Sequence, residues 1–109
     1  MPSNAPDPDA IRILLAELWQ SGLPLLRERL AVLDAAVAAA HSGHCTGDIR
    51  AQAIAEAHKL SGSLGMFGYP EGTNLAREIE ALLDAPTPPP PARLDDLTLA
   101  LRATLSLTN

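Results

Sequence analysis

The chain has 109 residues and a mass of 11.5 kDa, which fits a single domain. Hydrophobic residues make up 47% of the chain, but aromatic residues only 3%. The apolar residues are mostly alanine and leucine, whereas a β-sandwich usually needs aromatic and β-branched side chains. Its 8 basic and 13 acidic residues give a formal net charge of −5, the wrong sign for general nucleic-acid binding. Composition therefore argues against an all-β fold and against a nucleic-acid partner.

The sequence also carries no signal for secretion or for a membrane. Cys45 is the single cysteine and cannot form an internal disulfide. Roughly 20 mostly uncharged apolar residues are needed to span a bilayer, whereas the best candidate stretch includes Arg12, Glu17 and Pro24. We therefore expect a soluble, cytoplasmic protein with no membrane partner.

The N-terminal third of the chain predicts a frayed end followed by two helices. Residues 1–7 carry two prolines and no apolar pattern, so we expect a disordered N-terminus. Asp7 can cap a helix in which Pro8 occupies the first turn. One face of this short helix carries Ile11, Leu14, Leu15 and Leu18. Pro24 should then break or kink the chain, because it donates no backbone hydrogen bond.

Four longer amphipathic stretches follow. The first has the stripe Leu23, Leu26, Leu30, Leu33 and Val37, and residues 41–47 then form a loop. Thr46 or Asp48 can cap the next helix, whose stripe is Ile49, Ala53, Ala57, Leu60, Leu64 and Phe67. Gly68 and Pro70 separate it from a helix with the stripe Leu75, Ile79, Leu82 and Leu83. The last stripe is Leu94, Leu97, Leu101 and Leu105.

These patterns predict an all-α domain over residues 8–109, an antiparallel up-down four-helix bundle with a short additional N-terminal helix. Trp19 is expected to pack against the bundle. The proline-rich segment 86–91 reads as a stiff, extended connector. It could instead separate the bundle from a tail, but the leucine stripe that follows favours a helix that docks on the bundle.

The most unusual stretch is 57–68, with the sequence AHKLSGSLGMFG. Two glycines inside a helix each cost roughly 1 kcal/mol relative to alanine, so a packing or access reason is expected. A helical wheel surrounds His58 with small residues, namely Ala55, Ser61, Gly62 and Gly65. This pattern indicates an imidazole that a large partner can approach. The alternative is an ordinary, partly exposed histidine.

The segment AHKLSGS around His58, followed by Gly68 and by the segment LAREIE at 75–80, resembles the histidine-containing phosphotransfer (HPt) domain of two-component phosphorelays. The resemblance implies a helical bundle that accepts a phosphoryl group on His58. It also implies two partners, the receiver domain of a response regulator, whose aspartate exchanges the group, and a histidine kinase. The chain itself would bind no cofactor, and Mg²⁺ is expected on the receiver.

The resemblance also suggests roles for residues near His58. In the family, a glutamine or glutamate on the next helix orients the imidazole, and Glu80 matches that position; the alternative is a solvated surface charge. Ser61 stands where the family often has a lysine, so it is a candidate phosphoryl hydrogen-bond donor or a small spacer. Lys59 is a candidate for electrostatic support. Gly62, Gly65, Ala55 and Arg77 are assigned to a receiver docking face, and Arg77 could also add positive potential near the phosphoryl group.

Other chemical signals in the sequence are weaker. The glycines of 62–68 are not preceded by a strand and do not end in Gly-Lys-Ser/Thr, so no ATP site and no kinase activity are expected. His41, His44 and Cys45 can bind metals, but a structural zinc site normally has four ligands, and no metal site is expected. The runner-up function is a non-catalytic interaction module in which His58 is incidental. A phosphatase or metal hydrolase would need paired carboxylates or a metal set that the sequence does not supply.

Overall fold

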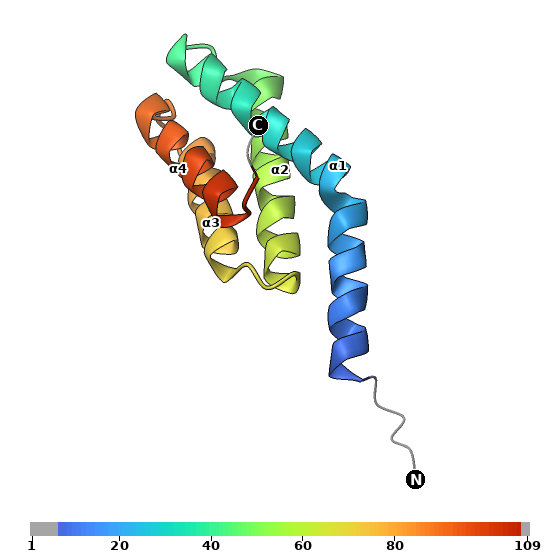
Figure 1. The fold of residues 1–109 in the computed structure, drawn as a ribbon. Coiled ribbons are helices and arrows are strands. Elements are labelled where there is room, and N and C mark those ends of the chain that lie inside the picture. Colours follow the sequence, from blue (N-terminus) through green and yellow to red (C-terminus); the bar gives the residue numbers. More distant parts are fainter. Residues whose placement is uncertain (1–6, 108–109) are drawn as a thin grey trace.

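The chain is described by a computed structural model that covers residues 7–107 and contains four helices and no strand in that range. Helix α1 spans Pro8–His41, α2 spans Gly47–Met66, α3 spans Pro70–Asp84 and α4 spans Pro91–Thr104 (Figure 1). Each helix packs against the next one along the chain, and α1 also packs against α4. The predicted all-α class is confirmed, and these contacts are consistent with a four-helix bundle.

The start of α1 follows the predicted capping chemistry. The Asp7 carboxylate accepts a hydrogen bond of 3.1 Å from the backbone N–H of Asp9, and Pro8 occupies the first turn. The cap satisfies one of the backbone donors that a helix leaves open at its N-terminus. Apart from Asp7, the predicted disordered stretch 1–7 lies outside the described residues.

The prediction of a separate short N-terminal helix is wrong, because α1 runs without interruption through Pro24. A proline inside a helix removes one backbone hydrogen bond and presses its ring on the carbonyl four residues earlier, here that of Gln20. The helix accommodates this strain by bending near its middle, as the change of axis in Figure 1 shows. Pro24 therefore kinks the segment and does not divide it.

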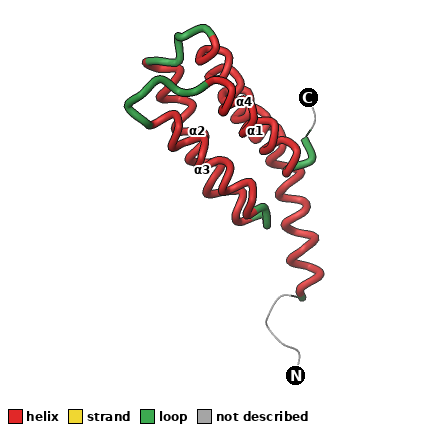
Figure 2. The backbone as a smooth tube through the Cα atoms, turned by 90° about the vertical axis from the view of Figure 1, so that its left-hand side faces the viewer, coloured by secondary structure: helices red, strands yellow, loops and turns green. Residues whose placement is uncertain are grey.

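The N-terminal part of α1 extends past the other three helices in both views (Figures 1 and 2). Consequently Ile11, Leu14 and Leu18 remain 42%, 54% and 47% exposed, although they share an apolar face. Trp19 is the residue through which this N-terminal part of α1 contacts the bundle. Its ring centroid lies 5.4 Å from that of Phe67 and 4.8 Å from that of Tyr69, which confirms that this tryptophan packs against the bundle.

The core consists of leucines from the predicted stripes and small residues between them. It contains Leu26, Leu30, Leu33, Val37, Ala53, Ala57, Leu60, Leu64, Ala76, Ile79, Leu83, Leu94, Leu97, Leu101 and Leu105, all at most 7% exposed. Ile49 is the exception to its stripe, since it is 44% exposed in the first turn of α2. The four buried leucines of the C-terminal stripe show that α4 docks on the bundle and is not a tail.

One side chain ties the beginning of α2 to the end of α3. Arg50 donates a hydrogen bond of 2.5 Å to the Leu83 carbonyl and another to the Ala85 carbonyl. Carbonyls at the end of a helix have no partner within the helix, so the guanidinium satisfies groups that would otherwise stay open. Nearby Cys45 is buried, and burial raises the pKa of its thiol above the ordinary value, an effect that the charge of Arg50 partly offsets.

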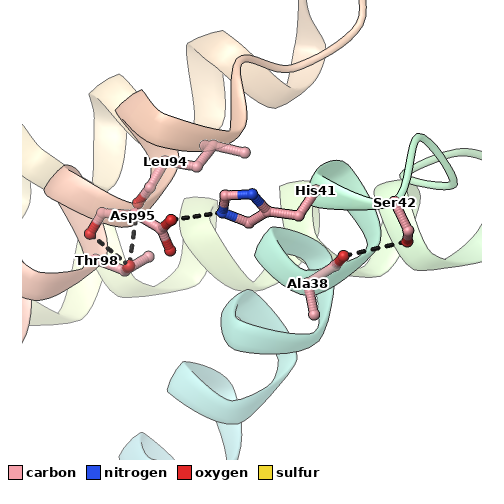
Figure 3. Close-up of polar contacts among 6 residues, drawn as sticks. All are labelled: Ala38, His41, Ser42, Leu94, Asp95 and Thr98. Carbon is pink, nitrogen blue, oxygen red and sulfur yellow. Dashed lines mark hydrogen bonds and ion pairs between the residues drawn. The ribbon is translucent and has the colours of Figure 1, made fainter.

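The opposite pair of helices, α1 and α4, is joined by a histidine. Nε2 of His41, at the end of α1, lies 2.5 Å from Oδ2 of Asp95 on α4 (Figure 3). Two of the three residues considered as metal ligands thus have other surroundings, His41 beside a carboxylate and Cys45 in the core.

No helix within residues 7–107 combines the length and the apolar character needed to cross a membrane.

Candidate functional site

His58 lies on the solvent-facing side of α2, in the fourth turn from its beginning. Its side chain is 74% exposed, whereas the neighbouring Ala57 and Leu60 are fully buried. The helix therefore holds the backbone of His58 firmly against the core while it presents the ring to solvent. A ring placed in this way can reach another molecule without any opening of the bundle.

Glu80 of α3 faces the imidazole. Its two carboxylate oxygens, Oε2 and Oε1, lie 3.1 and 3.3 Å from Nδ1 of His58, and its side chain is 28% exposed. A carboxylate only accepts hydrogen bonds, so this contact assigns the proton of the neutral ring to Nδ1. The lone pair then lies on Nε2, which is the nucleophilic nitrogen of such a ring.

The seam between α2 and α3 is fixed one turn further along by a threonine that the sequence analysis did not single out. The buried Thr73 hydroxyl donates a hydrogen bond of 3.1 Å to the Ser61 carbonyl, and the Ser61 hydroxyl donates one of 2.7 Å to the His58 carbonyl. Thr73 could have been noticed in the sequence because it is a polar residue on the apolar face of α3. This chain of contacts sets the register of α3 against α2, and with it the position of Glu80.

Ser61 consequently occupies a different environment from the one expected for a phosphoryl donor. The residue is 8% exposed, and its hydroxyl is bound to the backbone inside the helix seam. Serine in a helix commonly bonds back to a carbonyl of the preceding turn. The geometry therefore favours the alternative interpretation of Ser61 as a small, packed residue.

The small residues beside His58 divide into two kinds. Ala55, Gly62 and Gly65 are all exposed, as is Arg77 across the seam. A Cβ added at Gly62 would meet nothing within 4 Å, so this position is open. A Cβ at Gly65 would lie 3.3 Å from the Thr73 hydroxyl oxygen, so Gly65 allows α3 to approach α2. Of these two glycines, Gly62 is therefore the one that packing does not require.

Lys59 and Arg77 lie on different helices, Lys59 on α2 and Arg77 on α3. The Lys59 ammonium is 3.2 Å from Oε1 of Glu56, whose other oxygen is 3.3 Å from Nε of Arg29 on α1. Lys59 is therefore engaged on the α1 side of the helix. Arg77 is exposed on α3, one helical turn before Glu80.

Comparison with known proteins gives one family. A family model described as "Hpt domain" matches residues 9–107, nearly the whole chain. The match includes His58, Glu80 and the whole seam between α2 and α3. No match was found among curated proteins or among solved structures.

The two glycines should respond differently to alanine. Gly62→Ala should raise the free energy of unfolding by up to about 1 kcal/mol, because it removes backbone entropy and meets no neighbour. Gly65→Ala must displace the Thr73 hydroxyl and should be less stable than Gly62→Ala. Urea unfolding followed by circular dichroism measures both. Equal stabilisation by the two substitutions would contradict a packing role for Gly65.

Proposed function

We propose that this chain, which belongs to the Hpt domain family, accepts a phosphoryl group on Nε2 of His58 and exchanges it with the aspartate of a receiver domain. Hpt domains have a phosphotransfer role in two-component signalling and are carriers without an ATP site of their own. A histidine kinase is the other proposed source of the group. We place this exchange in the cytoplasm.

One observation carries the proposal, namely that Nδ1 of an exposed histidine faces a carboxylate while Nε2 is left to solvent. In the proposed step, the Nε2 lone pair attacks phosphorus of the aspartyl phosphate. The bond from phosphorus to the aspartate oxygen breaks, and the carboxylate leaves with its electron pair. The Nδ1 proton stays between the ring and Glu80, whose negative charge stabilises the positive charge that develops on the imidazole.

The bundle contributes a fixed nucleophile, and the partner contributes the rest of the reaction centre. We assign the docking face to the exposed small residues Ala55, Gly62 and Gly65, with Arg77 at its edge. The open space above Gly62 supports this assignment, because a receiver must bring its aspartate within bonding distance of His58. We expect Mg²⁺ to reside on the receiver, and this chain to bind no cofactor.

Replacement of His58 tests the acceptor. His58→Gln should fold normally and take up no label from phosphoramidate, whereas the parent should gain one phosphoryl group that is labile in acid and stable in mild base. Intact-mass measurement detects the adduct. His41→Gln and His44→Gln serve as matched controls that should keep full labelling. Label that persists in His58→Gln would overturn the assignment.

Replacement of Glu80 tests the orienting contact. Glu80→Ala should keep the helical content but slow phosphotransfer by roughly 10- to 100-fold, the scale of an orienting or acid–base contact. Glu80→Gln keeps an oxygen acceptor without the charge, so its rate of phosphotransfer should lie between those of the parent and of Glu80→Ala. Rates are measured by phosphoprotein gel shift. Glu71→Ala, at an exposed glutamate of the same helix, is the control, and an equal effect there would contradict the role of Glu80.

A bulky residue at Gly62 tests the docking face. Gly62→Gln should leave thermal stability near or above that of the parent, because the position is open, yet reduce transfer from a phosphorylated receiver by on the order of 100-fold. Labelling by phosphoramidate should change little, since a small donor does not need the whole surface. Gly62→Ala is the matched control. Full receiver transfer in Gly62→Gln would show that the partner docks elsewhere.

A further inference from the structure

One face of α1 and its N-cap carries a stripe of seven residues whose spacing is the same in both directions. The members are Asp7, Ile11, Leu14, Leu18, Gly22, Leu25 and Arg29, so the steps between them are four, three, four, four, three and four residues. Steps of three and four keep residues on one side of a helix. Because the spacing is symmetric about Leu18, a second copy of this helix running the opposite way would place every member opposite another member of the stripe.

The two halves of the stripe have different surroundings. Gly22, Leu25 and Arg29, together with Leu18, line a groove of about 120 Å³ between α1 and α2. The groove is open, since Leu25 is 50% exposed and a Cβ added at Gly22 would meet nothing within 4 Å. The N-terminal half of the stripe, which we call the ridge, lies on the part of α1 that extends past the other helices (Figure 1). Each chain therefore carries both a groove and an apolar ridge of matching spacing.

We propose that this stripe is the interface of a symmetric dimer, in which α1 of a second copy of the chain packs antiparallel against α1 with Leu18 on the two-fold axis. In this register the ridge of each copy fills the groove of the other. Ile11 packs against the partner's Leu25, and Leu14 enters the space above the partner's Gly22. Every contact then occurs twice, as in any two-fold interface in which the same patch of both subunits meets.

The charges of the stripe favour the antiparallel direction. The same register places Asp7 opposite the partner's Arg29 at both ends of the interface. Both groups keep capacity for this pair: Oδ1 of Asp7 accepts the N–H of Asp9, which leaves Oδ2, and Arg29 contacts Glu56 through Nε at 3.3 Å, which leaves its two terminal nitrogens. A parallel copy would instead place Asp7 beside Asp7 and Arg29 beside Arg29. Opposite charges that meet in only one orientation select that orientation.

The dimer also supplies the packing that the beginning of α1 lacks within its own chain. Ile11 and Leu14 are 42% and 54% exposed, and most of the stability of a helix in a protein comes from burial of its apolar face. His58 and Glu80 are not among the residues that line the groove. The proposal thus goes beyond phosphotransfer and does not depend on it.

Sedimentation equilibrium of the full chain tests the interface. The parent should show twice the chain mass of 11.5 kDa at micromolar concentration. Leu18→Glu brings two carboxylates together at the two-fold axis and should raise the dissociation constant of the dimer at least about 100-fold. Leu14→Glu, on the ridge, should weaken the dimer as well. Ile13→Glu is the matched control, because Ile13 is apolar and 60% exposed on the same part of α1 but lies outside the stripe, so the dimer should persist.

Mixing two variants tests the register. Leu18→Glu and Leu18→Lys should each be monomeric, because like charges meet at the axis, whereas an equimolar mixture should form a dimer in which a carboxylate faces an ammonium. Only a residue that faces its own copy behaves in this way. Circular dichroism of each variant establishes that the helices are intact, and His58→Gln should remain dimeric.

Four results would overturn the proposal. The first is a parent that stays monomeric at micromolar concentration, which would leave the stripe to a different partner. The second is a dimer that persists in Leu18→Glu and Leu14→Glu. The third is equal dissociation by Ile13→Glu, which would indicate unspecific apolar association. The fourth is a mixture of the folded Glu and Lys variants that stays monomeric. A dimer whose His58 takes up no phosphoryl group would leave this interface intact and overturn only the proposed function.

Discussion

The close approach of α2 and α3 is the constraint on which the site depends. Ala53, Ala57 and Ala76 are fully buried, and such small side chains let two helix backbones come near each other. Arg50 then fixes one end of the seam through the Leu83 carbonyl, and Thr73 fixes the middle through the Ser61 carbonyl. Glu80 faces His58 because both residues project from this one rigid seam. The geometry of an exposed pair is thus set by contacts that are mostly buried.

Much of this arrangement could be predicted from the sequence, because leucines at three- and four-residue spacing can only be buried on one side of a helix. The pairing of His58 with Glu80 was anticipated from a family resemblance, and the structure brings the two within 3.1 Å. Spacing within one helix carries no information about the partner helix. Therefore the contact of Thr73 with Ser61, which sets the register, could not be derived from the pattern.

The predictions from the sequence that the structure contradicts, a separate helix before Pro24 and the burial of Ile49, fail for local physical reasons. Pro24 was expected to break or kink the chain, and a separate short helix was expected before it. The helix bends but continues, because one missing hydrogen bond is too small a loss to stop a helix whose following turns are anchored by Leu26 and Leu30. Ile49 fits the apolar spacing but lies in the first turn of α2, where it is 44% exposed. Ile11 and Leu14 are exposed because the N-terminal part of α1 extends past the other three helices. Periodicity identifies a face, and only the lengths of neighbouring helices decide whether that face is covered.

The distribution of charge explains why an exposed histidine suits a carrier. Most cations of the bundle are engaged in ion pairs, such as Arg102 with Asp34 and Arg93 with Glu78, so they do not neutralise a new anion. A phosphoryl group on His58 would be held by few contacts and could leave as readily as it arrives. A deep cationic pocket would stabilise the phosphorylated form and slow its release. With an exposed ring and one orienting carboxylate, the partner instead sets the equilibrium between the phosphorylated and unphosphorylated forms of His58.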